Sequence, residues 1–83
     1  MELEERVGRT LALFGENLKL LGEVKLTVEE NEIVELAKMY ASDTKSFMKK
    51  GDNVTAFSSI EYAHGLLDAI LKLRGKNPYD TDK

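Results

Sequence analysis

The sequence predicts an all-α protein, an up-down-up three-helix bundle, and three observations lead to this prediction. Apolar residues recur at three- and four-residue spacing in three segments of the 83-residue chain. Glycines and helix-capping residues separate these segments, and no stretch alternates apolar and polar residues as a β-strand does. We therefore expect a single three-helix domain over residues 1–75, followed by a polar tail at 76–83.

The first helix is predicted from about Glu2 to Leu21, and Gly22 is expected to end it. Its apolar residues fall on one narrow stripe, which consists of Leu3, Val7, Leu11, Phe14, Leu18 and Leu21.

Glycines repeat every seven residues along one edge of this stripe, at positions 8, 15 and 22. Each interior glycine costs about 0.8–1 kcal/mol of helix propensity relative to alanine. Either a neighbouring backbone approaches closely there, or the helix is loosely held. Leu13 and Leu20 point away from the stripe on a common side, which raises the hypothesis of a homodimer contact through these two leucines.

The second helix is predicted to begin after Thr27, because Thr27 and Glu30 have capping-box spacing, and to run to Lys50. We expect a broad apolar face on it, made of Ile33, Leu36, Ala37, Tyr40, Thr44, Phe47 and Met48.

Gly51 ends the second helix, and Asp52 is placed to cap the third helix at once. The apolar stripe of the third helix consists of Ala56, Phe57, Ile60, Ala63, Leu67, Ile70 and Leu71, and the helix should end before Gly75. So short a connection makes helices two and three an antiparallel hairpin. Helix one is expected to fill the groove that the hairpin leaves.

Composition restricts the classes of function. The net charge of −3 argues against a dedicated nucleic-acid binder, which needs a basic surface. The chain has no cysteine, which excludes disulfides, thiol chemistry and cysteine-ligated zinc. No apolar run approaches the roughly 20 residues of a membrane span, and the acidic start "MELEERVGRT" lacks the pattern of a signal peptide. We expect a cytoplasmic protein that does not bind membranes.

The only histidine, His64, lies between Glu61 and Asp68. Glu61 and His64 have the Glu-x-x-His spacing of di-iron helical bundles, but those sites take ligands from four helices and no second such motif is present. Nor does a serine or cysteine lie one turn from His64 as a nucleophile. We expect no cofactor, no bound metal and no enzymatic activity, and we keep a metal or enzyme site around His64 as a third alternative.

A polar cluster is predicted where helices two and three face each other. Thr44 should hydrogen-bond back to the carbonyl of Tyr40, and the Tyr62 hydroxyl is expected to reach Asp43 across the hairpin. Such a cluster is either an interhelical clip or a surface that binds a partner. A glycine inside a helix, here Gly65, usually marks tight helix packing.

The stretch "YASDTKSFMKKGDNVTAFSSIEYAHGLLDAI" resembles a small archaeal family, domain of unknown function 357. The resemblance depends on which amino acids stand at positions 40, 43, 51, 52, 56, 57, 62, 63 and 65 to 68. These positions lie in the second and third predicted helices and in the turn between them. It implies a compact three-helix bundle and an archaeal source, but no activity. Thr44 departs from the alanine expected there, and His64 occupies a position with no fixed type.

The leading hypothesis is a non-enzymatic protein-interaction module or adaptor. Its predicted interaction residues lie along the polar edge of the hairpin and are Tyr40, Asp43, Tyr62, Gly65 and Asp68. The alternative is a weak nucleic-acid-associated protein that uses a basic bundle end. That end would comprise Arg6, Arg9, Lys45, Lys49 and Lys50.

Overall fold

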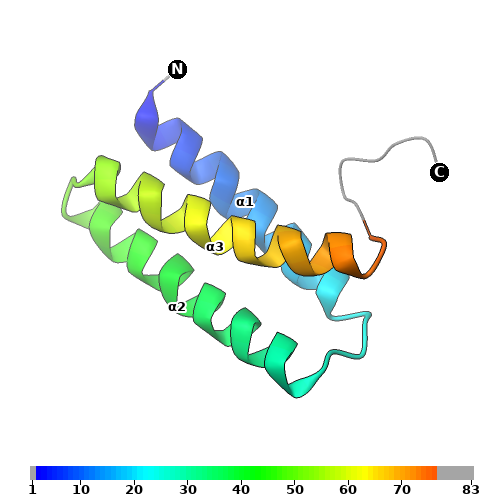
Figure 1. Ribbon diagram of the computed structural model, residues 1–83. Helices are drawn as coiled ribbons and strands as arrows, with labels where there is room; N and C mark the ends of the chain where they lie inside the picture. Colours follow the sequence, from blue (N-terminus) through cyan, green and yellow to red (C-terminus); the bar gives the residue numbers. More distant parts are fainter. Residues whose placement is uncertain (1, 77–83) are drawn as a thin grey trace.

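Three helices account for most of the chain. The computed structural model describes residues 2–76, and the helices are α1 (Leu3–Leu21), α2 (Val28–Lys49) and α3 (Asn53–Leu73) (Figure 1). They run up, down and up, and a tight turn joins α2 to α3 as an antiparallel hairpin. The predicted fold class is confirmed. The predicted tail lies, except for Lys76, outside the described residues.

The helix ends follow from local side-chain chemistry. The Thr27 hydroxyl accepts a hydrogen bond from the Glu30 amide (3.1 Å), and the Glu30 carboxylate accepts one from the Thr27 amide (2.9 Å). The carboxylate of Asp52 accepts a hydrogen bond from the amide of Thr55 (3.1 Å) at the start of α3. Gly51 has a φ of 78°, which glycine adopts without steric strain, so the chain can reverse between α2 and α3.

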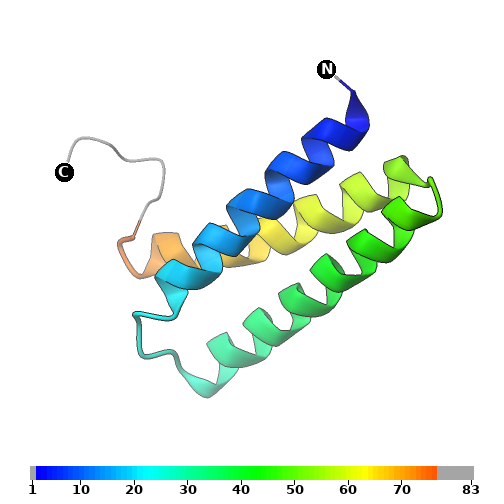
Figure 2. The ribbon, with the colours of Figure 1, turned by 180° about the vertical axis from the view of Figure 1, so that it is seen from behind.

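Helix α3 is the centre of the bundle. Its side chains Ile60, Leu67 and Leu71 are fully buried, and both other helices pack against it. By contrast, α1 and α2 make only weak contact with each other, as the views from the front and from behind both indicate (Figure 2). The expectation that helix one fills the groove beside the hairpin is therefore only partly right. Helix α1 covers one side of α3, and a groove remains between α1 and α2.

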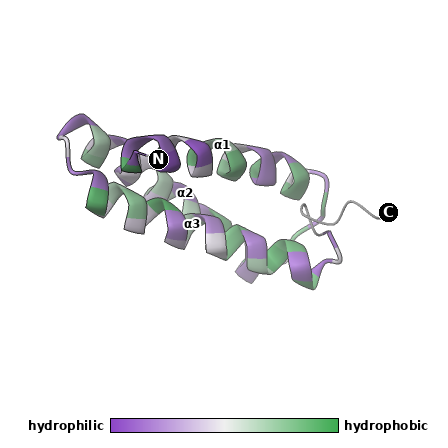
Figure 3. Cartoon of the chain, turned by 90° about the horizontal axis from the view of Figure 1, so that it is seen from above, coloured by the Kyte–Doolittle hydropathy of each residue, from purple (hydrophilic) through white to green (hydrophobic). Residues whose placement is uncertain are grey.

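The buried stripe of α2 differs from the predicted one. Leu36 and Tyr40 are exposed, whereas Val34 and Ala41 are buried. The buried stripe is turned towards α1, because Val34 and Ala41 line the hollows that α2 shares with α1, whereas Leu36 and Tyr40 lie on the flank away from them. In Figure 3 apolar and polar residues are interspersed along each helix, as one-sided burial requires.

An ion pair closes the open end of the hairpin. The guanidinium of Arg74, just after α3, donates from Nε to the Glu30 carboxylate at 3.0 Å and makes a second bond from Nη2. The Arg74 guanidinium, together with the Thr27 amide, lowers the pKa of Glu30 from 4.5 to about 2. Glu30 therefore caps α2 and also ties its start to the end of α3.

Candidate functional site

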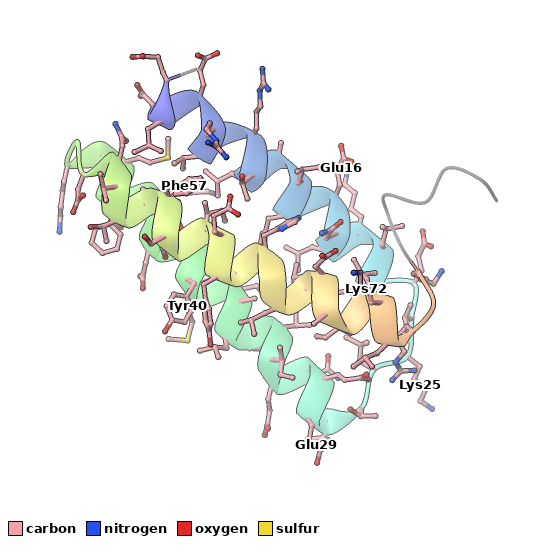
Figure 4. All side chains as sticks on the ribbon, turned by 45° about the horizontal axis from the view of Figure 1, so that its top comes forward. Glu16, Lys25, Glu29, Tyr40, Phe57 and Lys72 are labelled. Atoms are coloured by element: carbon pink, nitrogen blue, oxygen red, sulfur yellow. The ribbon has the colours of Figure 1, made fainter. Side chains whose placement is uncertain are left out.

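Two tyrosines from neighbouring helices pack against each other at the surface. The ring of Tyr40 on α2 lies 4.8 Å from the ring of Tyr62 on α3, at an interplanar angle of 67°. This edge-to-face geometry is a favourable one for aromatic rings. Even so, Tyr40 is 37% exposed and Tyr62 is 50% exposed. The rings are thus held against each other while part of each remains in contact with solvent. Figure 4 shows Tyr40 on the side of α2.

The main chain beneath Tyr40 is fixed by two hydroxyls. Thr44 Oγ1 donates to the Tyr40 carbonyl oxygen at 2.8 Å, as predicted, and Ser59 Oγ on α3 donates to the same oxygen at 2.8 Å. Both donors are buried. The predicted bond between Tyr62 and Asp43 does not form among residues 2–76, and the contact that Tyr62 makes across the hairpin is with the Tyr40 ring. The interhelical clip therefore exists with different partners.

Further apolar side chains extend this surface along α2. We define the tyrosine face as Leu36, Met39, Tyr40 and Tyr62, all of which are exposed. Helical spacing places Glu32 one turn before Leu36, and Asp43 one turn after Met39. The face is therefore apolar in the middle and acidic at its two ends along α2.

Two predicted interaction residues lie elsewhere. A Cβ added to Gly65 would meet no atom within 4 Å, so the expectation of tight packing at Gly65 is wrong. Asp68 lies two helical turns after Glu61, whose carboxylate accepts a hydrogen bond from the Thr10 hydroxyl of α1 (3.0 Å). Asp68 is thus on the side of α3 that faces α1, whereas the tyrosine face lies on the side of α2.

The interface of α1 and α3 contains a polar feature that the sequence did not reveal. Asn17 of α1 is only 2% exposed, and its Nδ2 has no hydrogen-bond partner among the described residues. Oδ1 of Asp68 is likewise buried without a partner there. Asn17 immediately precedes Leu18 of the predicted stripe, so only its position beside that stripe could have suggested burial.

His64 is half-buried on the same side of α3, one turn from Glu61. Within residues 2–76 no group of three or more His, Asp or Glu side chains is arranged to hold a metal ion. The Glu61 carboxylate is instead engaged by Thr10. Through this hydrogen bond Glu61 belongs to the interface between α1 and α3.

The two leucines of the hypothesised dimer contact differ in their surroundings. Leu13 is 41% exposed, whereas Leu20 is partly buried and packs against the core. Leu20 therefore contributes to the interior of the domain, and a contact through both leucines remains a prediction.

The residues of the predicted basic end have mixed surroundings. The Arg6 guanidinium lies 5.2 Å from the centre of the Phe57 ring, a cation–π contact between α1 and α3. Lys45 lies further from that end and lines the groove between α1 and α2. The acidic residues Glu4 and Glu5 lie in the first turn of α1, next to Arg6, so this end of the bundle carries charges of both signs.

The groove between α1 and α2 consists of two adjoining hollows of about 520 and 530 Å³. Leu11, Gly15 and Leu18 form its wall on α1, and Lys38 and Ala41 lie opposite on α2.

None of the described helices is long and apolar enough to cross a membrane.

Comparison with known proteins bears on the family alone. Residues 15–75 match the sequence model of a family described as protein of unknown function DUF357. The match covers the end of α1 and all of α2 and α3, which includes both tyrosines and the Ser59 hydrogen bond. No curated protein matches the chain. With most of its length in the match, the chain belongs to the DUF357 family.

Proposed function

We propose that this protein is a non-enzymatic interaction module whose tyrosine face binds a segment of another protein. The observation that carries the proposal is the Tyr40–Tyr62 pair, which is fixed in geometry while each ring remains partly exposed to solvent. Tyrosine is enriched at the energetic centres of protein interfaces, because its ring offers a large contact area at a low cost in side-chain entropy.

Pre-organisation strengthens this argument. A surface that is already ordered loses less conformational entropy on binding. Here the ring contact holds the side chains, and the Ser59 hydrogen bond holds the main chain of Tyr40. Leu36 and Met39 add exposed apolar area beside the rings. A flexible methionine also adapts readily to the shape of a partner.

The charges around the face indicate the chemistry of the partner. Glu32 and Asp43 flank the apolar centre, and Val28, Glu32 and Glu35 line an apolar hollow with Leu36 and Met39. We infer that the partner presents apolar side chains flanked by lysine or arginine, because opposite charges at the rim favour encounter and orientation. The same acidic rim would repel nucleic acid.

The experiment is site-specific photo-crosslinking in the cells that make the protein. A photoreactive phenylalanine analogue replaces Met39 in one variant and the exposed Lys72 of α3 in a control variant. We expect one discrete adduct from position 39 and none from position 72. In the adduct, the crosslinked segment of the partner should be apolar and flanked by basic residues.

Two substitutions make this test specific. Tyr62→Ala removes one ring, and Asp43→Lys reverses a rim charge, so each should reduce the yield of the position-39 adduct severalfold. Circular dichroism of each variant verifies that the helices persist. The proposal fails if position 39 gives no adduct, if position 72 gives the same one, or if neither substitution changes the yield.

The nucleic-acid alternative remains a prediction that salt dependence can test. Binding of an oligonucleotide through the basic end should weaken steeply as salt concentration rises. The acidic residues Glu4 and Glu5 in the first turn of α1 reduce the positive potential there, so we favour the tyrosine face.

A further inference from the structure

The glycines of α1 have no explanation within a single chain. A Cβ added to Gly8 or to Gly15 would meet no atom within 4 Å, so no neighbouring backbone of the described residues requires either glycine. Helix α1 is nevertheless continuous from Leu3 to Leu21. Gly15 also lies in the wall of the groove between α1 and α2, together with Leu11, Ala12 and Leu18.

These glycines belong to one edge of α1 that is open to a second helix. Residues three or four positions apart lie one helical turn after another along this edge. We define the glycine edge of α1 as Glu4, Gly8, Leu11, Ala12, Gly15 and Lys19. The residues in the middle of the glycine edge are small or apolar, and the residues at its two ends are charged. Among the described residues, neither Glu4 nor Lys19 makes an ion pair.

The glycine edge is complementary to itself when reversed. If a second α1 lies antiparallel with Gly8 opposite Gly15 of its copy, Glu4 falls opposite Lys19 and Leu11 falls opposite Ala12. The two-fold axis repeats each of these pairs. A parallel arrangement would instead place Glu4 against Glu4 and Lys19 against Lys19. The charges therefore select the antiparallel arrangement.

We propose that two copies of this chain form a two-fold symmetric dimer through the glycine edges of their α1 helices. Glycine at positions 8 and 15 lets the two backbones approach closely, and the second copy covers the α1 wall of the groove. This is an isologous contact, in which one patch meets the same patch of its copy, as in most two-fold dimers. The contact does not involve the tyrosine face, so the two proposals stand or fall separately.

The test measures the mass of the full chain by sedimentation equilibrium at concentrations from about 10 μM to about 1 mM. Over this range a dimer is detected even if its dissociation constant is as high as about 1 mM. We expect twice the chain mass of 9.3 kDa at the upper end of this range. Gly15→Gln should leave a monomer, because a long side chain on the edge prevents close approach. The helix should persist by circular dichroism, since an added Cβ at Gly15 meets no atom of the described residues within 4 Å and the groove beside it has room for a longer side chain.

Gly65→Gln is the matched control. Gly65 is also a mid-helix glycine with no atom within 4 Å of an added Cβ, but it lies on α3. This variant should remain a dimer. Charge exchange provides a second test: Glu4→Lys or Lys19→Glu alone should weaken the dimer roughly tenfold, and the two together should restore it.

Three results would overturn the proposal. The wild-type chain could stay a monomer up to 1 mM, the Gly15→Gln variant could dimerise as the wild type does, or the double charge exchange could fail to restore dimerisation. Loss of the dimer in Leu13→Glu with retention in Gly15→Gln would place the contact on the opposite edge of α1 and also contradict the proposal.

Discussion

The hydroxyl of Ser59 on α3 donates a 2.8 Å hydrogen bond to the main-chain carbonyl of Tyr40 on α2. The same carbonyl oxygen also accepts the Thr44 hydroxyl. Ser59 and Tyr40 are 19 positions apart in the sequence, so the Ser59 hydrogen bond joins the two helices of the hairpin at mid-length. It fixes the main chain of Tyr40, whose ring belongs to the tyrosine pair.

Removing this bond should weaken the domain. We expect Ser59→Ala to reduce the free energy of unfolding by about 1 kcal/mol, because a buried hydrogen bond is lost while Thr44 still satisfies the carbonyl. Urea unfolding followed by circular dichroism measures the change. Ser58→Ala is the control, since Ser58 is exposed and should change stability by less than about 0.5 kcal/mol. Equal effects of the two substitutions would contradict the assigned role of Ser59.

The Glu30–Arg74 pair predicts a dependence of stability on acid pH. The pKa of Glu30 is lowered to about 2 in the folded chain, so between about pH 4.5 and pH 2 the unfolded chain binds more protons at this site. The contribution of Glu30 to stability is therefore fully present above about pH 4.5 and is lost as the pH falls towards 2. Asp52, whose pKa is lowered by its hydrogen bonds from Thr55, acts in the same direction.

Thermal unfolding midpoints from pH 6 to pH 2 measure this effect in the wild type and in Glu30→Gln. Glutamine can keep the capping hydrogen bonds but does not titrate. We expect the midpoint of the variant to fall less steeply with acid than that of the wild type. Glu29→Gln is the control, because Glu29 is exposed and should leave the wild-type slope nearly unchanged. Identical slopes for the wild type and Glu30→Gln would refute the assignment.

The unpartnered amide of Asn17 predicts that an apolar residue of similar size is better tolerated. A buried polar atom without a hydrogen bond costs about 1–3 kcal/mol, so we expect Asn17→Leu to raise the free energy of unfolding by about 1 kcal/mol. Asn31 is the contrasting position, because its side chain donates to the Thr27 carbonyl and is exposed. Asn31→Leu should leave stability unchanged or slightly lower. Destabilisation by Asn17→Leu would mean that the Asn17 amide is satisfied in solution.

Two glycines should respond in opposite directions to the same substitution. Gly65→Ala should stabilise the chain by about 0.5–1 kcal/mol, because alanine favours helix and an added Cβ meets nothing. Gly51→Ala should destabilise it by about 1 kcal/mol or more, because Gly51 has a φ of 78°. Denaturant unfolding of both variants compares the signs. A loss of stability in Gly65→Ala would indicate a contact at Gly65 that a single chain does not contain.

Local chemistry made much of the fold predictable. The capping box at Thr27 and Glu30, the cap at Asp52 and the turn at Gly51 depend on residues within a few positions of one another. Gly22 is a partial exception. It follows the last residue of α1 as expected, but its φ of −64° is one that any residue adopts, and an added Cβ would lie 3.3 Å from the Lys19 carbonyl oxygen.

The candidate site was predictable only in part. Tyr40 and Tyr62 were placed correctly on facing helices, because the short turn sets the register of the hairpin. The expectation for Gly65 was wrong, since an added Cβ there would meet no atom of residues 2–76 within 4 Å. Whether Tyr62 meets Asp43 or the ring of Tyr40 depends on side-chain directions across the interface, which sequence spacing does not specify.

Periodicity and contacts between near neighbours specify the three helices, their ends and the antiparallel hairpin, so these features are predictable from the order of the amino acids. Where α1 rests, and therefore which residues of α2 are buried, depends on packing between segments that are far apart in the chain. With α1 covering one side of α3 and making only weak contact with α2, Val34 and Ala41 are covered while Leu36 and Tyr40 remain exposed. The tyrosine face and the groove both result from this arrangement, because the apolar face of α2 is broader than one neighbour covers, and the position of α1 decides which part of that face is covered.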